Sequence, residues 1–291
     1  MSWRTVVIGN RAKLDFKMNY MIVRKDDEVT KIFISEIYMV IIESTAVSMT
    51  AVLLNELVKA KVKIVFCDEK RNPASEILSI YGCHNTSRRC REQINWSAKI
   101  KSRVWHQILR TKIGNQANLL KSLGKTSYNL VDAYRAALKE DDPSMNEGHA
   151  ARVYFTTLFG HSFSREQDNN INAALNYGYS LLLSAINREI VGMGYLTQLG
   201  LFHSNQFNPF NLGSDFIEPL RGIVDRLVVT WDHKQFERSH KYQLVELLSE
   251  DVQIDGQIQV LSAAIKIYCK SIFDALNNED INLIRFISYE L

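Results

Sequence analysis

The sequence contains little cysteine and little proline, with four residues of each among 291. Cys83 and Cys90 are separated by six residues, which matches none of the short ligand spacings of structural zinc sites. Cys67 and Cys269 lie in apolar and helical runs, so we expect them to pack as small hydrophobic residues. This composition excludes a disulfide-dense secreted module, and we expect four reduced, non-catalytic thiols.

Long hydrophobic runs are also missing from the sequence. No apolar stretch approaches the roughly 18 residues that a membrane-spanning helix needs. Residues 1–10 lack the basic, apolar and small-residue order of a signal peptide. Hydrophobic residues make up 46% of the chain and charged residues 23%, which excludes a disordered or collagen-like chain. We therefore expect a cytoplasmic protein with no membrane partner.

The hydrophobic pattern changes character near residue 83. Before this point, short apolar or β-branched runs alternate with turns, and one stretch has the spacing of an amphipathic helix. After it, the pattern is helical. The sequence thus predicts an α+β fold, with a small β-sandwich-like N-terminal domain over residues 1–82 and an all-α bundle over residues 83–291. Strands are expected at 4–8, 18–24, 29–34, 37–42, 62–66 and 77–81, and helices at 48–61, 91–123, 127–139, 144–159, 170–195, 215–231, 241–248, 256–276 and 279–289.

The net charge of +3 hides an uneven distribution of charge along the chain. Residues 83–125 carry ten Lys or Arg against a single Glu, whereas residues 126–291 carry 13 against 21 acidic residues. A local basic excess is the electrostatic footprint of a polyanion such as nucleic acid, although a solvated helix face has the same composition. The DNA-binding candidates are Arg88, Arg89, Arg91, Lys99, Lys101 and Arg103.

Three segments of the helical part carry residue types that support metal binding or catalysis. Glu147 follows Ser144 at the spacing of a capping box, which would give it only a structural role at a helix start. His203 lies at a helix-to-loop junction, where a lone histidine is usually a cap or a surface residue. Asp215 and Glu218 are three residues apart at a helix N-terminus, which the helix dipole favours without any further function.

Together these segments offer two or three carboxylates and one imidazole. This donor set suits a divalent cation such as Mg²⁺ or Mn²⁺. Zinc is less suitable because it usually takes more histidine or thiolate ligands. Arg221 is placed to pair with Glu218 at the i+3 position, which is again possible without chemistry. From the residues alone, a metal site and a set of helix caps both stay open.

Four motifs, in this order and spacing, resemble CRISPR-associated protein one, the integrase and endonuclease of CRISPR spacer acquisition. The likeness runs over essentially the whole chain, and the Trp-Arg opening is similar to the type II branch of the family. The motifs are Trp3-Arg4-Thr5-Val6-Val7-Ile8, Glu147-Gly148-x-x-Ala151-x-x-Tyr154-Phe155, Gly200-x-x-His203 and Asp215-x-x-Glu218-Pro219-x-Arg221-x-x-x-Asp225.

The resemblance implies a metal-dependent enzyme that joins the 3′-hydroxyl ends of new spacer DNA to the repeat array by phosphodiester transfer. It places the metal ligands on Glu147, His203 and Glu218, and the implied cofactor is Mg²⁺ or Mn²⁺. Asp215 takes the nearby acidic position, as an alternate ligand or as a partner of a ligand. Some relatives carry Asp where this chain has Glu218, so which of the two carboxylates binds metal directly stays open.

The resemblance also implies partners. It predicts a homodimer, with the N-terminal domain in dimerisation or partner contact, that joins the small CRISPR-associated protein two and other type II adaptation proteins. The nucleic-acid partner would be double-stranded DNA, both the spacer donor and the CRISPR repeat.

Two further functions are compatible with the residues. One is a metal-dependent phosphodiesterase that cuts without joining, and the other is a non-catalytic DNA-binding scaffold.

Overall fold

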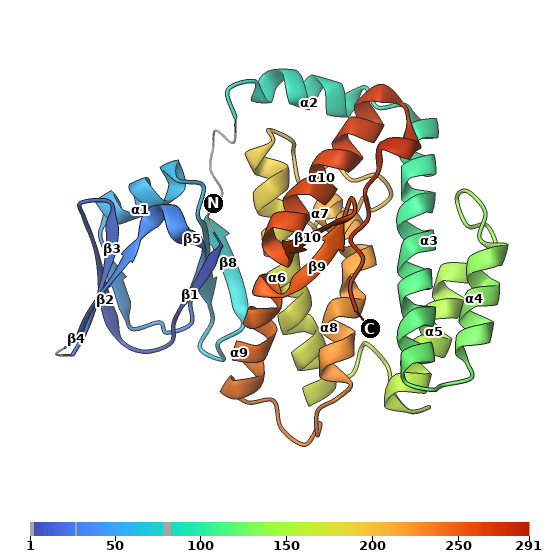
Figure 1. Ribbon diagram of the computed structural model, residues 1–291, viewed down its shortest axis with the longest axis horizontal. Coiled ribbons are helices and arrows are strands. Elements are labelled where there is room, and N and C mark those ends of the chain that lie inside the picture. The colour runs from blue at the N-terminus through green and yellow to red at the C-terminus, as the bar shows by residue number, and fades with distance from the viewer. Residues whose placement is uncertain (1–2, 27, 78–82, 291) are drawn as a thin grey trace.

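The computed structural model describes residues 3–26, 28–77 and 83–290. The chain forms two parts, a β-rich part that contains the N-terminus and a larger helical part (Figure 1). The predicted α+β fold class is therefore confirmed. The strand expected at 77–81 and the domain boundary expected at residue 82 fall almost wholly outside the described residues, so that boundary stays a prediction.

Two four-stranded sheets make up the β-rich part. In the inner sheet, β1 and β5 are parallel, β5 and β7 are parallel, and β8 runs antiparallel to β7. The strands of this sheet, in spatial order, are β1 (Arg4–Ile8), β5 (Ile37–Ile42), β7 (Lys63–Cys67) and β8 (Pro73–Ile77). The outer sheet has the order β4 (Glu28–Phe33), β3 (Tyr20–Lys25), β2 (Ala12–Lys17) and β6 (Val47–Met49). The sequence pattern did not predict β2 and β6.

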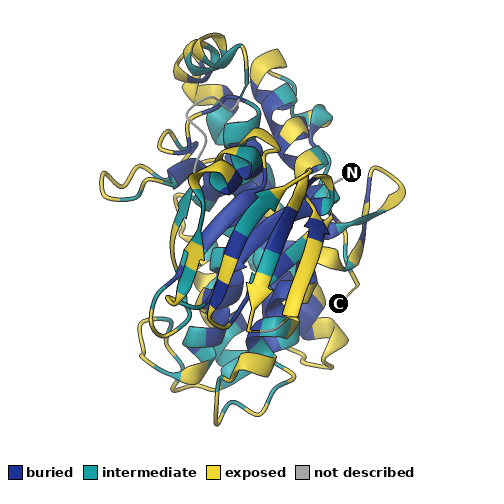
Figure 2. Ribbon diagram, turned by 90° about the vertical axis from the view of Figure 1, so that its left-hand side faces the viewer, coloured by how far each residue is buried: buried dark blue, intermediate teal, exposed yellow. Residues whose placement is uncertain are grey.

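Burial explains this arrangement. All six residues of β5 are buried, as expected for a central strand with an apolar run and no alternation. Strand β4, by contrast, is almost entirely exposed, and Figure 2 shows the molecule from this side, with exposed residues along the outer strands. The α-helix α1 (Ala51–Lys59) of this part begins where the Thr50 hydroxyl accepts a hydrogen bond from Leu53 N at 3.3 Å. Leu53 and Leu57 from this helix enter the core of the β-rich part.

The helical part contains most of the expected helices. The expected helix over 91–123 is split in two, because Trp96 turns into the core and donates to Asn277 Oδ1 at 2.9 Å while Ser97 caps the next helix. The helix expected over 215–231 is also divided, by a 3₁₀ turn at Glu218–Leu220, so Asp215 lies inside a helix that begins at Asn211 and not at a helix N-terminus. The helices are α2 (Thr86–Ile94), α3 (Ala98–Ser122), α4 (Tyr128–Ala137), α5 (Asn146–Phe159), α6 (Asn170–Gly192), α7 (Asn211–Ile217), α8 (Arg221–Val228), α9 (Arg238–Glu246) and α10 (Leu261–Asn278), with short 3₁₀ turns at Ile34–Glu36, Glu218–Leu220, Leu247–Ser249 and Ile281–Leu283.

The end of the chain corrects two expected helices. The helix expected from Gly256 begins only at Leu261, because β9 (Asp251–Ile254) and β10 (Gln257–Val260) form an antiparallel hairpin. Asp255 and Gly256 both have positive φ, the conformation that a tight hairpin turn requires. The helix expected over 279–289 is also wrong, since residue 288 pairs with β9 instead. The helical part is thus not all-α.

Helix α3 positions the elements that carry the candidate site. It packs against the hairpin of α4 and α5 on one side and against the Glu218–Leu220 turn, α8 and α10 on the other (Figure 1). Its buried residues lie in the large core of the helical part, together with those of α6 and α10. Among the described residues, no helix has the length and apolarity needed to cross a membrane.

A substitution at Gly178 tests how tightly α6 packs against α8. A Cβ atom at this position would lie 2.5 Å from Val224 Cγ1, so Gly178→Ala forces α8 and α6 apart and is expected to destabilise the protein by about 1–3 kcal/mol. At Gly192, near the end of the same helix, a Cβ atom would have no neighbour within 4 Å. Gly192→Ala is therefore the matched control, with little loss of stability. Urea unfolding measures both, and equal effects would contradict the packing argument.

Candidate functional site

Glu147 lies in the first turn of α5, where its side chain is not used as a cap. The carboxylate of Asp142 caps this helix instead, accepting from Asn146 N through Oδ1 and from Glu147 N through Oδ2, each at 2.9 Å. Met145 is the N-cap residue, so the expected capping box of Ser144 and Glu147 is wrong. Because Asp142 satisfies the helix start, the carboxylate of Glu147 is available to other elements.

Lys112 of α3 joins Glu147 to Glu218. Its Nζ atom lies 2.5 Å from Glu147 Oε1 and 2.6 Å from Glu218 Oε2. The lysine side chain is 13% exposed and that of Glu218 only 7%. Burial by itself would lower the pKa of Lys112, but the charges of Glu218 and Glu147 outweigh this effect and raise it. From the sequence, Lys112 counted only as one charge of the basic segment.

Glu218 is held in its ionised form by a second cation. Arg221 Nη2 lies 2.9 Å from Glu218 Oε1, which confirms the i+3 pairing expected from the sequence. Burial would raise the pKa of Glu218, but Arg221 and Lys112 outweigh it and lower the pKa to about 2. Asn115 fixes the turn against α3, since its Nδ2 donates to the Pro219 carbonyl at 2.8 Å.

Asp215 and His203 form a second pair beside the first. His203 Nδ1 lies 2.6 Å from Asp215 Oδ1, and the same carboxylate accepts from the backbone N–H groups of residues 201, 202 and 203. Gly200 makes this wrapping possible, because a Cβ atom there would lie 2.3 Å from the His203 backbone oxygen. The hydrogen bond to the Asp215 carboxylate raises the pKa of His203, against the lowering effect of burial.

The four predicted site residues therefore form two adjoining pairs. Glu147 and Glu218 share one ammonium group, and His203 is bound to Asp215. Glu218 lies close enough for its charge to raise the pKa of His203 as well. In residues 3–26, 28–77 and 83–290, no three His, Cys, Asp or Glu side chains are gathered as a metal-binding group. The ammonium of Lys112 stands between two of the three expected ligands.

The donor chemistry nevertheless fits a divalent ion. Glu218 Oε2 is buried, accepts from no backbone N–H group of the described residues and faces the Lys112 ammonium at 2.6 Å. Glu147 contributes a second carboxylate, and His203 keeps Nε2 as the ring nitrogen not facing Asp215. Carboxylate oxygens and one imidazole nitrogen are a set that Mg²⁺ or Mn²⁺ accepts.

Asp225 is a buried carboxylate that is connected to the site residues. Tyr154 OH donates to Asp225 Oδ2 at 2.8 Å, and Tyr179 OH donates to Oδ1. The guanidinium of Arg221 lies over the Tyr179 ring, 4.6 Å from its centroid, and also pairs with Glu218. A buried carboxylate is thus linked to Glu218 through one tyrosine and one arginine. The sequence motif contains Asp225, but spacing gives it no role.

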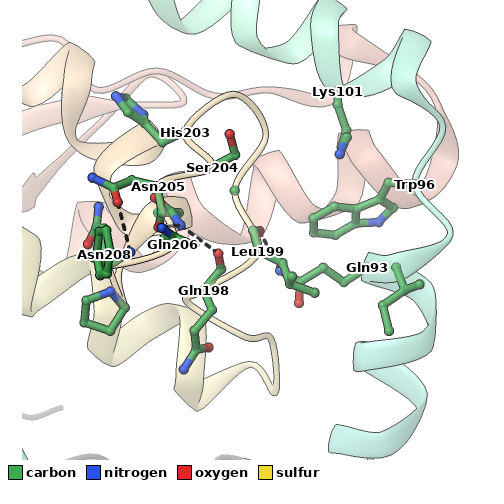
Figure 3. A pocket seen from close by; sticks show the side chains of 15 residues that line it. Gln93, Trp96, Lys101, Gln198, Leu199, His203, Ser204, Asn205, Gln206 and Asn208 are labelled. Atoms are coloured by element: carbon green, nitrogen blue, oxygen red, sulfur yellow. Dashed lines mark hydrogen bonds between the residues drawn. The ribbon is translucent and has the colours of Figure 1, made fainter.

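A cleft of about 790 Å³ connects His203 to the basic segment. Figure 3 shows Trp96 and Lys101, from the start of the basic segment, facing the amide-rich loop that follows His203. The other candidates differ in their partners. Arg88 and Arg89 both pair with Glu92 at 2.8 Å. Arg91, Lys99, Lys101 and Arg103 form no salt bridge with another described residue.

Comparisons with known proteins show the family of the chain. The family model described as "CRISPR associated protein Cas1" matches residues 5–247. The chain is 34% identical over 230 residues to the CRISPR-associated endonuclease Cas1 of Neisseria meningitidis serogroup C (strain 8013), covering 79% of this chain and 76% of that protein.

Two solved structures share the fold. A casposase bound to its integration product has a TM-score of 0.77 at 16% identity, over 97% of this chain and 92% of the casposase. A chain of a Cas6-RT-Cas1–Cas2 complex has a TM-score of 0.76 at 18% identity. The match covers 97% of this chain but spans only 36% of that longer chain.

Asp225→Asn is expected to change how stability depends on pH. Burial raises the pKa of Asp225 from its ordinary 3.8 to about 6, against the lowering effect of hydrogen bonds from Tyr179 and Tyr154. Since the folded pKa exceeds the unfolded one, the folded state favours the protonated carboxyl, and stability falls as the pH rises through both values. At about 1.4 kcal/mol per unit, the wild type should lose up to about 3 kcal/mol relative to the variant between about pH 4 and pH 7.

Urea unfolding at a series of pH values measures this difference. Asp232→Asn, at a side chain that is 71% exposed, controls for the change in net charge. A difference between wild type and Asp225→Asn that stays constant with pH would contradict a raised pKa.

Proposed function

The chain belongs to the Cas1 family of CRISPR-associated proteins, and from this premise we propose that it is a divalent-metal-dependent DNA integrase. It would join the 3′-hydroxyl ends of spacer DNA to the CRISPR repeat by phosphodiester transfer. The observation that carries this proposal is the convergence of Glu147 and Glu218, from separate elements, on one cation position beside His203. Helix caps alone would not bring the two carboxylates together.

The carboxylate oxygens of Glu147 and Glu218 and the Nε2 atom of His203 would hold Mg²⁺ or Mn²⁺. When bound, such an ion supplies positive charge to a phosphodiester oxygen and favours the deprotonated attacking hydroxyl. Asp215 keeps His203 Nδ1 occupied, which orients the ring and leaves Nε2 for binding. Arg221 keeps Glu218 ionised. Protonation of His203 would remove a ligand, so we expect activity to fall at acidic pH.

The proposed partners follow from the relatives and from the charge distribution. One similar structure is a Cas1–Cas2 complex and another is a casposase with its integration product. We propose that this chain likewise binds double-stranded DNA and a small Cas2 protein, and that it acts as a homodimer with its N-terminal part in partner contact. Lys101 lies in the same cleft as His203, so the basic segment would guide DNA toward the site.

Substitution of the three proposed ligands tests the reaction. Glu147→Gln, Glu218→Gln and His203→Ala should each lower strand transfer by at least about a hundredfold, because each removes a donor that the reaction depends on. The assay supplies purified Cas2, Mn²⁺, a donor with free 3′-hydroxyl ends and repeat DNA, and it scores joined and cut products separately. Exposed Glu166, changed to Gln, is the matched control.

Each outcome of this assay has a meaning. Normal joining by any one variant would remove that residue from the site. Wild-type protein that cuts the repeat without joining the donor would contradict the integrase and favour a phosphodiesterase. DNA binding without either product, in the presence of metal, would favour a scaffold.

The basic segment gives a prediction that is independent of the metal site. The triple variant Arg91→Ala, Lys99→Ala, Lys101→Ala should weaken DNA binding evenly across sequences. Its salt dependence, the slope of log K against log salt, should become shallower by about 0.9 for each phosphate that the variant no longer neutralises. Lys234→Ala, at a side chain that is 85% exposed on another surface loop, is the single-charge control. An unchanged slope would remove the segment from the DNA interface.

A further inference from the structure

Lys112 lies at the centre of the acidic pair. Its Nζ atom is within 2.6 Å of oxygen atoms from both Glu147 and Glu218, and its side chain is 13% exposed. The two carboxylates come from α5 and from the turn before α8, whereas the lysine comes from α3. Two acidic groups from separate elements thus converge on one point, and the ammonium group fills it.

A divalent ion bound by the same carboxylates needs this point. Mg²⁺ lies about 2.0–2.1 Å from its oxygen ligands, so an ion held by both carboxylates would lie closer to their oxygen atoms than the ammonium nitrogen does and would compete with it for them. The two cations also repel each other at such a separation. Lys112 and the metal are therefore alternative occupants of one place.

The charges of the cluster explain why an occupant is needed at all. Glu147 and Glu218 are balanced by Lys112 and Arg221, so the metal-free cluster is neutral. Without the lysine, Glu218 would keep Arg221 as its cationic partner among the described residues, and the two carboxylates would repel each other with no cation between them. A divalent ion that displaces the ammonium while the lysine stays near the carboxylates would change the cluster from neutral to +2, and this charge would attract a phosphodiester.

We propose that Lys112 is a built-in counter-cation, which holds Glu147 and Glu218 in place without metal and withdraws when the divalent ion binds. The measured metal affinity then reflects the difference between the free energy of binding the ion and the free energy of displacing the ammonium group. It is not the intrinsic affinity of the carboxylates for the ion. The flexible four-carbon stem of lysine allows the withdrawal. This inference rests on the metal-dependent function proposed above.

Metal binding, measured without DNA, tests the inference. Lys112→Gln removes the charge but keeps amide donors for the carboxylates, and Lys112→Ala removes both. Each variant should bind Mn²⁺ at least about tenfold more tightly than the wild type, which corresponds to about 1.4 kcal/mol. Titration calorimetry and the Mn²⁺ electron paramagnetic resonance signal measure the affinity.

Thermal unfolding provides the second readout. Without metal, Lys112→Gln should unfold at a lower temperature than the wild type, and saturating Mn²⁺ should raise its midpoint by more than that of the wild type. Exposed Arg110 of the same helix, changed to Gln, controls for the loss of one positive charge. Glu147→Gln controls for the loss of a ligand and should bind Mn²⁺ weakly.

The outcomes separate this inference from the proposed function. If the wild type binds Mn²⁺, Glu147→Gln loses binding and both Lys112 variants match the wild type, the counter-cation is refuted while the metal site stands. Weaker binding by Lys112→Gln would also refute it. If no variant binds Mn²⁺, both proposals fail. Tighter binding by both Lys112 variants without strand transfer by the wild type would support the counter-cation and refute the integrase.

Discussion

Charge compensation in a nearly buried place is the constraint on which the site depends. Glu218 is 6% exposed yet ionised, and an uncompensated charge at such a position costs several kcal/mol. Lys112 and Arg221 supply the compensation from two different helices. Because Lys112 also meets Glu147, one ammonium group draws α3, α5 and the turn before α8 to a single point. The packing of α3 against these elements keeps the three side chains in contact with one another.

Buried polar contacts also join the β-rich part to the helical part. Lys63 Nζ on β7 lies 2.6 Å from Glu76 Oε1 on β8, and Ser184 Oγ on α6 donates to Glu76 Oε2 at 2.9 Å. From α9, Lys241 Nζ donates to the Lys70 carbonyl at 2.8 Å. Helix α6 in turn packs against α7, which carries Asp215. A Cas2 protein or second copy bound to the N-terminal part, as proposed, would therefore stand at a defined position relative to the site.

The sequence predicts features that depend on neighbouring residues. It does not predict contacts between residues that are far apart in the chain. The fold class, most helices and the pairing of Arg221 with Glu218 follow from short-range periodicity and spacing. Lys112 could not be found in this way, because its acidic partners lie 35 and 106 residues away and its own neighbours on α3 are ordinary helix residues. The hairpin at residues 251–260 is missed for a different reason. Asp255-Gly256 is a recognisable turn signal, but the expected helix begins at Gly256 and so includes the residues of β10.

The contacts of the two carboxylates also favour one assignment that the sequence leaves open. Asp215 is fully buried and accepts from three backbone N–H groups and from His203 Nδ1, so binding a metal would strip hydrogen bonds from the loop that it supports. Glu218 meets cations instead, with Arg221 at one oxygen and Lys112 at the other. The second contact is with a side-chain ammonium, so a divalent ion in its place would leave no backbone N–H group without an acceptor. Glu218 is therefore suited to bind the ion, and Asp215 to hold the imidazole beside it.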